Sequence, residues 1–202
     1  MKTLIIVVFA SIGLFGCTSP TPNYYTLQDV LEETVPLPST ADYQFEMLGV
    51  RMPAQVDLPQ LVVRRDQGRL VILESERWAT PLADEFHDAL TARLERRLGV
   101  RDISGLVKDP KRATLSVRVD IRRFESLPGN YALLDAIWRV NLRAVGQAPK
   151  VITCSGRFRE PADIALSSLV LAHQKIIDEL ATAIAGNAGK LLIDVSPSCQ
   201  AL

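Results

Sequence analysis

The chain has 202 residues, 48% of them apolar, and it carries 23 Lys and Arg against 23 Asp and Glu. This length suits a single domain, and the apolar fraction is enough for a hydrophobic core. A net charge of zero excludes the strongly basic character by which nucleic-acid-binding domains are usually recognised, so we expect no nucleic-acid partner.

The first 16 residues predict a lipoprotein signal peptide. After Met1-Lys2, the apolar stretch 4–15 is within the roughly 7–15 residues of a signal-peptide core and shorter than the about 20 residues of a membrane-spanning helix. The tetrapeptide Leu-Phe-Gly-Cys at 14–17 resembles the lipobox of bacterial lipoproteins, in which cleavage leaves an N-terminal cysteine that carries the lipid. We therefore predict lipidation of Cys17. The alternative is a simple secretory signal with an incidental cysteine.

The segment 17–23 predicts a flexible tether. It is small, polar and proline-rich, and such a segment cannot bury enough apolar surface to offset the entropy of ordering it. Thr18 is not aspartate, and by resemblance to Gram-negative lipoproteins this favours the outer membrane, facing the periplasm.

Short β-rich runs follow the tether. We predict a first strand at 24–27, an acidic proline-containing loop at 29–42 and a strand at 45–52. Two further runs, 61–64 and 69–72, flank a glycine-containing turn and predict a hairpin.

An amphipathic helix is predicted next. Thr80 suits its N-cap, Pro81 its first position, and Gly99 its end. Apolar residues at three- and four-residue spacing mark one buried face: Leu82, Phe86, Ala89, Leu90, Leu94 and Leu98.

Three longer strands and a second helix complete the pattern. Apolar and polar residues alternate along 115–122 and 134–143, and with 151–158 these runs predict an antiparallel meander. A long helix is expected over 164–185, closed by the two glycines at 186 and 189. The order of elements indicates an α+β fold: a largely antiparallel β-sheet with two amphipathic helices packed on one face, in a single domain over 24–195. The residues 196–202 are then a C-terminal tail.

Two cysteines remain in the mature chain. Cys154 lies in a predicted strand and Cys199 in the tail, and an exported protein can join such a pair in a disulfide. The alternative is a buried free thiol and a tail thiol. Neither has a histidine or further cysteine at metal-ligand spacing, so no metal site is expected.

The sequence contains little that predicts catalysis. His87 and His173 are isolated, and there is no nucleophile elbow, phosphate-binding loop or His-Glu-x-x-His motif. We therefore expect no enzyme and no cofactor other than the covalent lipid on Cys17.

Five residues are candidates for contact with a partner. Arg118, Arg122, Arg139 and Arg143 lie on predicted polar strand faces and could form a basic patch that meets a partner or lipid headgroups. The alternative is a solvated face balanced by acidic neighbours. Trp78 could anchor an interface or pack against the first turn of the following helix.

Several short motifs resemble the PqiC-like family, the ABC-type transport auxiliary lipoproteins. They are the lipobox, Tyr-Tyr-Thr-Leu at 24–27, Pro-Gln-Leu-Val at 59–62, Trp-Ala-Thr-Pro-Leu at 78–82, and the later strand that carries Trp138. Their order and spacing cover nearly the whole mature chain.

The resemblance implies a non-enzymatic outer-membrane lipoprotein that supports membrane integrity. Its implied partners are a PqiB-like tunnel protein with MCE domains, the inner-membrane partner of that protein, and outer-membrane phospholipid. Because MCE assemblies are rings, the resemblance also implies that several copies of this lipoprotein could form a matching homo-oligomeric ring. The alternative function is a lipid-binding carrier that encloses an acyl chain.

Overall fold

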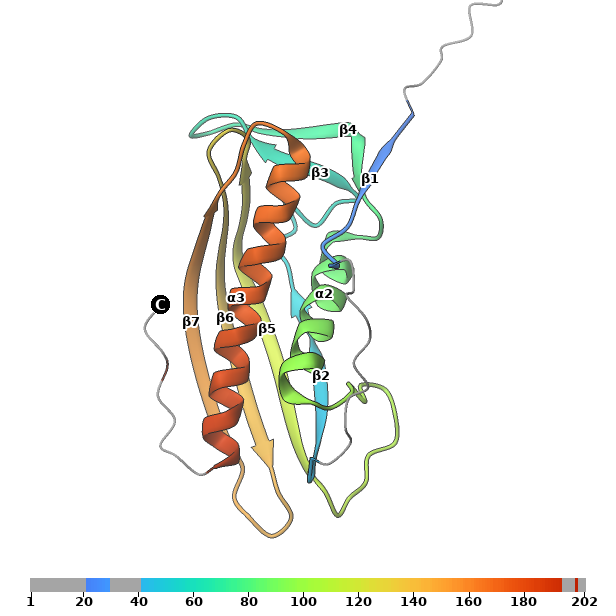
Figure 1. Ribbon diagram of the computed structural model, residues 1–202, viewed down its shortest axis with the longest axis vertical. Helices are drawn as coiled ribbons and strands as arrows, with labels where there is room; N and C mark the ends of the chain where they lie inside the picture. The colour runs from blue at the N-terminus through green and yellow to red at the C-terminus, as the bar shows by residue number, and fades with distance from the viewer. Residues whose placement is uncertain (1–20, 30–40, 194–198, 200–202) are drawn as a thin grey trace, which may run out of the picture.

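The computed structural model describes residues 21–29, 41–193 and Cys199 (Figure 1). In chain order its elements are β1 Asn23–Tyr25, β2 Tyr43–Arg51, β3 Gln60–Arg64, β4 Leu70–Trp78, α2 Leu82–Leu98, β5 Ala113–Leu127, β6 Tyr131–Arg143, β7 Lys150–Pro161 and α3 Leu166–Leu192. The predicted signal peptide, Cys17 and most of the predicted tail lie outside these residues. None of the helices described is long and apolar enough to cross a membrane.

Four strands form the larger sheet, in the order β2-β5-β6-β7. The predicted antiparallel meander is confirmed by β5, β6 and β7, whereas β2 pairs with β5 in parallel. The inner face is buried, and its apolar residues are Leu115, Val117, Val119 and Ile121 on β5 and Leu134, Ala136, Trp138, Val140 and Leu142 on β6. Gly156 on β7 leaves room for this core, because a Cβ there would lie 3.2 Å from both Trp138 and Phe158.

Three strands form a smaller sheet, in the order β1-β4-β3. The predicted hairpin is confirmed by the antiparallel pair β3 and β4, but β4 continues through a polar run as far as Trp78. There it pairs in parallel with β1, with Asn23 opposite Glu76 and Tyr25 opposite Trp78. The N-terminal strand therefore lies at the same end of the molecule as this hairpin (Figure 1).

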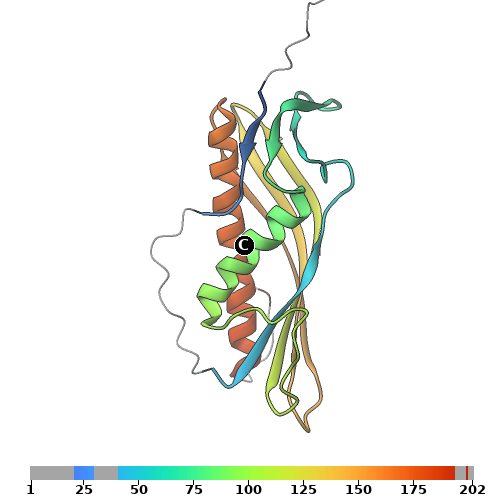
Figure 2. The same cartoon turned by 90° about the vertical axis from the view of Figure 1, so that its right-hand side faces the viewer.

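Both helices lie on one face of the larger sheet (Figure 2). α3 packs on β5, β6 and β7, and α2 packs against α3 and β2. The predicted α+β fold is thus confirmed, with the strands divided between two sheets instead of one. Most of the opposite face of the larger sheet is not covered by a helix (Figure 2).

The helix α3 continues past its predicted end. Gly186 and Gly189 lie within it, because its buried face extends through Asn187 to Leu191. The Asn187 side-chain oxygen accepts a hydrogen bond of 2.8 Å from the indole N–H of Trp138. This buried polar contact ties the last turns of α3 to β6.

The N-terminus of α2 also differs from the prediction. Its N-cap is Pro81 rather than Thr80, and no side chain of the cap residue bonds the helix. Instead, Asp57 accepts a hydrogen bond of 3.0 Å from the backbone N–H of Ala83. The Thr80 hydroxyl donates a hydrogen bond of 3.2 Å to the carboxylate of Glu85.

His173 is a buried core residue of α3. Its ring stacks on Phe124 with 4.0 Å between the centroids, and its Nε2 lies 2.8 Å from the hydroxyl of Ser126. Burial disfavours the charged imidazolium and lowers the pKa of His173 from 6.5 to about 3. The histidine therefore stays neutral in the folded protein at neutral pH.

Stability should fall as the pH drops below about 6.5. The unfolded chain then takes up a proton at His173 that the folded protein does not bind until about pH 3, so each pH unit in that window costs roughly 1.4 kcal/mol. We expect His173→Gln to be less stable than the wild type at pH 7.5 and to lose about 2 kcal/mol of that deficit by pH 5. Urea unfolding over this range measures both. His87→Gln, in a partly exposed site, is the control, and a deficit for His173→Gln that is the same at both pH values would contradict the argument.

Candidate functional site

Three of the four predicted arginines lie together on the outer face of the larger sheet. Arg118 on β5 is directly opposite Arg139 on β6. Arg143 lies on the same face of β6 as Arg139, with Asn141 between them. Cross-strand neighbours on one face lie about 4.5–5.5 Å apart at their Cβ atoms, so Arg118 and Arg139 form a close pair of like charges.

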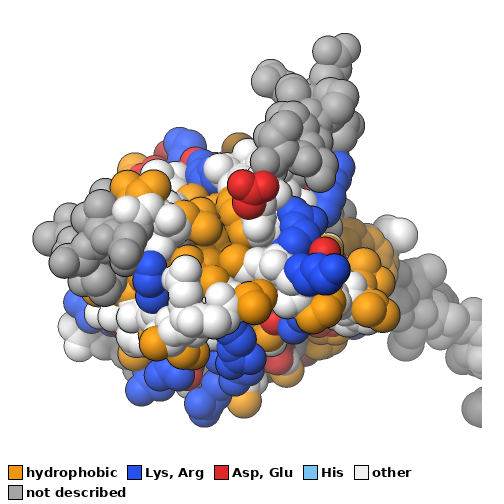
Figure 3. Space-filling view, turned by 90° about the horizontal axis from the view of Figure 1, so that it is seen from below, with side chains coloured by type: hydrophobic (Ala, Val, Ile, Leu, Met, Phe, Trp, Pro, Cys, Tyr) orange, Lys and Arg blue, Asp and Glu red, His pale blue; other side chains and the backbone are white. Residues whose placement is uncertain are grey.

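These arginines line an open hollow of about 450 Å³, here called the basic hollow. Its lining residues are Leu48, Ser116, Arg118, Arg139, Asn141, Arg143, Pro149 and Val151. Leu48 is 45% exposed and Val151 is 48% exposed, so apolar surface borders the charges. Figure 3 views the end of the molecule that is far from β1 and shows several Lys and Arg side chains along its lower edge, with hydrophobic side chains near them.

Carboxylates do not neutralise the basic hollow. Among the described residues, none forms an ion pair with Arg118 or Arg143, and Arg139 makes only a long hydrogen bond, 3.4 Å, to the hydroxyl of Thr153. Glu46, which accepts a hydrogen bond of 3.3 Å from the hydroxyl of Ser116, is 2.5 Å from the ammonium group of Lys108. The hollow therefore keeps a local positive charge in a chain whose net charge is zero.

Arginines elsewhere on this face are paired. Arg122 lies 3.6 Å from Asp120, which also lies 3.5 Å from Arg51. Arg157 donates to Asp135 at 2.9 Å. The expectation of a basic patch thus applies to Arg118, Arg139 and Arg143, whereas Arg122 belongs to the alternative, a face balanced by acidic neighbours.

Trp78 is not available to a partner, which corrects its prediction as a contact residue. Its side chain is only 4% exposed, and its ring meets Phe124 edge-on at 6.3 Å. Because β1 and β3 cover β4 on either side, Trp78 joins the smaller sheet to the core. Its role is structural, and its ring contact is with Phe124 of β5.

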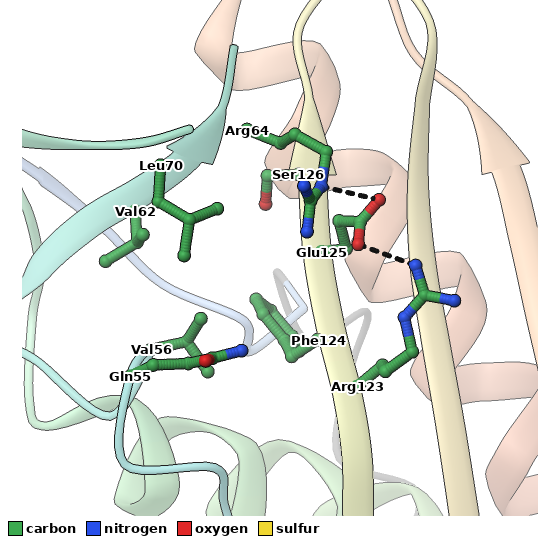
Figure 4. A pocket seen from close by; sticks show the side chains of 9 residues that line it. All are labelled: Gln55, Val56, Val62, Arg64, Leu70, Arg123, Phe124, Glu125 and Ser126. Atoms are coloured by element: carbon green, nitrogen blue, oxygen red, sulfur yellow. Dashed lines mark hydrogen bonds and ion pairs between the residues drawn. The ribbon is translucent and has the colours of Figure 1, made fainter. Parts of the chain in front are cut away.

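A buried carboxylate that the sequence did not reveal joins the two sheets. The carboxylate of Glu125 on β5 forms ion pairs with Arg64 of β3 at 3.0 Å and with Arg123 at 2.8 Å (Figure 4). It also accepts a hydrogen bond of 2.5 Å from the hydroxyl of Tyr131. Burial raises the pKa of Glu125, but the hydrogen bonds from Tyr131 and Arg123 and the charges of Arg123 and Arg64 outweigh burial, so the net pKa is lowered. The adjoining pocket has a volume of only about 50 Å³, and the carboxylate is already bound by protein groups. We therefore assign Glu125 a structural role.

Two buried charges hold the segment that leads from the predicted tether into the domain. Glu85 accepts hydrogen bonds from the hydroxyl of Thr26 at 2.8 Å and from the backbone N–H of Leu27 at 3.0 Å. Two turns along α2, Arg93 binds the carboxylate of Asp29 and the backbone oxygen of Leu27. Glu85 and Arg93 are 2% and 1% exposed, so this attachment is part of the core.

The structure joins Cys154 and Cys199 in a disulfide, with 2.05 Å between the sulfur atoms and 45 residues of sequence separation. Cys154 lies on the buried face of β7, which is an edge strand of the larger sheet. The bond therefore fixes Cys199 beside that edge. No group of His, Cys, Asp and Glu in the described ranges could hold a metal ion.

Comparisons with known proteins identify the class to which this arrangement belongs. Residues 25–185 match the family model of the ABC-type transport auxiliary lipoprotein component. This chain belongs to that family, which is described as a transport auxiliary component rather than as an enzyme.

Two solved structures share the fold. A crystal structure of an uncharacterised protein has a TM-score of 0.63 and 18% identity, and the match covers 84% of this chain and 99% of the other. A crystal structure of a protein from Xanthomonas campestris, of the family DUF330, has a TM-score of 0.59 and 17% identity, over 87% of this chain and all of the other. The comparison with curated proteins gave no match.

Removing one charge from the opposed pair should stabilise the protein. Like charges directly opposite on neighbouring strands are destabilising, so we expect Arg118→Gln to raise the free energy of unfolding by roughly 0.5 kcal/mol in a phosphate-free buffer of low ionic strength. The gain should shrink in about 0.5 M NaCl, where charges are screened over a few ångströms. Arg157→Gln is the matched control on the same face and should be destabilising, because it breaks the ion pair with Asp135. A loss of stability in Arg118→Gln at low salt would contradict this interpretation.

Proposed function

We propose that this protein is an outer-membrane lipoprotein that serves an MCE-type lipid transport system between the two membranes of a Gram-negative cell. Lipid on Cys17 would anchor it, facing the periplasm, and the folded domain would dock the tip of a PqiB-like tunnel protein that reaches across from its inner-membrane partner. The role is a mechanical and binding one, in support of membrane integrity. Membership of the family of transport auxiliary lipoproteins supports it.

The observation that carries the proposal is the placement of two features at opposite ends of the molecule. β1 leads into the domain beside the end of β4 at Trp78, while the turn between β6 and β7 lies at the far end (Figure 1). Thr21, where the described chain begins, is four residues from Cys17, a reach of at most about 14 Å. An anchor on Cys17 would therefore keep the β1 end at the membrane.

The far end has the character of a contact surface. Leu106 and Val107, between α2 and β5, are 66% and 98% exposed, and Val145, between β6 and β7, is 66% exposed. Arg143 ends β6 at the same end. Exposed apolar side chains rimmed by charge are typical of protein-binding sites. This is the surface that would meet the tunnel protein, and a ring of several copies would match the ring symmetry of MCE assemblies.

The alternative function, a carrier that encloses an acyl chain, has less support. The pocket beside Glu125 holds about 50 Å³, whereas ligand pockets hold about 300–1,000 Å³. The larger hollows of the described residues are open to solvent. Lipid contact at the surface fits this geometry better than enclosure.

Loss of the anchor should release the domain without unfolding it. We expect Cys17→Ala to move the protein from the membrane fraction to the soluble periplasmic fraction, because acyl chains supply about 0.8 kcal/mol of membrane affinity for each buried methylene. Cys199→Ser is the matched control: it also removes a cysteine but should remain in the membrane fraction. Fractionation and immunoblotting measure both variants. A Cys17→Ala protein that still sediments with outer membranes would contradict the anchoring.

Contacts of the two ends can be separated by site-specific crosslinking in living cells. A photoreactive residue in place of Val107 should capture an MCE-domain protein, identified by mass spectrometry, because Val107 lies at the end that would meet the tunnel. The same residue in place of Tyr24, which is 64% exposed at the other end, should not capture it. Capture from position 24 alone would reverse the proposed orientation, and capture of no MCE protein from either position would refute the docking role.

A further inference from the structure

The basic hollow has an unusual balance of charge. Arg118 and Arg139 lie directly opposite each other on β5 and β6, and Arg143 follows on β6. No carboxylate of the described residues forms an ion pair with Arg118 or Arg143. Facing like charges destabilise a sheet unless an anion lies between them. Every other arginine that we describe on this face has an acidic partner nearby, so the exception is confined to one place.

A second observation at the same place points to a ligand. The side-chain oxygen of Asn141 is buried and has no hydrogen-bond partner, although buried polar atoms are almost always satisfied. Asn141 lies between Arg139 and Arg143 and lines the same hollow. Its amide group can donate two hydrogen bonds as well as accept, so a bound group with oxygen atoms and a hydroxyl would satisfy it.

We propose that the basic hollow binds the phosphoryl group of a phospholipid. Arg118 and Arg139 would donate N–H groups to phosphate oxygens from either side, a geometry that the planar guanidinium group suits. Arg143 and Asn141 would contact the polar headgroup. The exposed apolar side chains of Leu48 and Val151 would contact the first methylenes of the acyl chains. This inference rests on the proposed function, because it names the lipid-contacting site of the same transport protein.

The surroundings favour a lipid over an acidic protein segment or a nucleic acid. The unpaired charges are confined to three positions on β5 and β6, since the paired Asp120 and Asp135 lie farther along the same strands. An extended polyanion would need a longer basic surface. Apolar side chains beside the arginines suit a molecule that is anionic at one end and apolar at the other.

The position of the hollow indicates lipid in transit rather than the anchoring membrane. Arg118 is nine residues from Leu127, which lies at the end of β5 nearest to β1, and this corresponds to roughly 30 Å along the strand. A phospholipid in the anchoring leaflet would meet the β1 end first. A lipid delivered at the far end would meet the hollow.

The test uses the full chain with Cys17→Ala and three probes of defined chemistry. They are short-chain phosphatidylglycerol below its critical micelle concentration, glycerol 3-phosphate and inorganic phosphate, each titrated by calorimetry. We expect phosphatidylglycerol to bind at least tenfold more tightly than either free phosphate. The double variant Arg118→Gln/Arg139→Gln should lose at least tenfold in affinity for phosphatidylglycerol. Leu48→Ser should lose most of the preference for the lipid while it still binds free phosphate.

The controls make each outcome decisive. Arg157→Gln, on the same face, should bind phosphatidylglycerol like the parent chain, and thermal unfolding should show that the double variant is folded. Equal affinity for the lipid and for glycerol 3-phosphate would assign the hollow to a free anion and overturn the proposal. Unchanged lipid binding in the double variant would overturn it as well. A third result would also overturn it: the parent chain binds no lipid, and the double variant loses the Val107 crosslink. That result would assign the arginines to contact with the tunnel protein.

Failure of this inference can be told from failure of the proposed function. Crosslinking at Val107 reports docking without any lipid, and calorimetry reports lipid binding without any tunnel protein. A protein that docks but binds no lipid keeps the proposed function and loses this inference.

Discussion

The buried attachment of the N-terminal segment to α2 decides at which end of the molecule the chain enters the domain. Glu85 and Arg93 hold Thr26, Leu27 and Asp29 from within the core, and the amide of Gln174 on α3 donates 3.1 Å hydrogen bonds to backbone oxygens of the same segment. Removing Asp29 would leave the buried guanidinium group of Arg93 without this carboxylate, and a buried charge that loses its partner is costly. Because the segment is fixed there, the chain enters the domain at one end only. That fixed entry distinguishes the β1 end, which would lie near the membrane under the proposed anchoring, from the far end.

The larger sheet has two faces with different roles. Its inner face belongs to the core and is sealed by α3, with the contact between Trp138 and Asn187 as a buried polar link. On its outer face the charges follow a gradient along the strands. Toward the β1 end, Glu125, Asp135 and Asp120 neutralise nearby arginines, whereas Arg118, Arg139 and Arg143 toward the far end are not neutralised by described carboxylates. The two ends of the outer face therefore differ in local charge, although the net charge of the molecule is zero.

The sequence was sufficient to predict elements with a clear period, and insufficient wherever distant segments decide the structure. The alternation along β5 and β6 and the spacing in α2 predicted those elements, because local patterns of apolar residues control which face is buried. Gly186 and Gly189 gave a false end to α3, since the tertiary contact of Asn187 with Trp138 outweighs the low helix propensity of glycine. The parallel pairs of β1 with β4 and β2 with β5 leave no local signal. For the site, strand alternation placed the arginines on one face. Only the register shows that Arg118 opposes Arg139, and only the side-chain positions show that Asp120 pairs with Arg122. Trp78 was ambiguous because a large aromatic residue suits a core and an interface equally.

The parallel pairing of β1 with β4 has a mechanical consequence. Hydrogen bonds between strands run across the strand direction, so a pull along β1 from a membrane anchor would load all the bonds of the three paired residues together instead of opening them one at a time. Beyond β1, the same pull would reach Glu85 and Arg93 before it reached the larger sheet. Forced detachment of this kind is governed by an unfolding rate rather than by equilibrium stability. When the distance between two membranes fluctuates, tension would therefore be borne by this short segment and α2, and the outer face of the larger sheet would keep its shape.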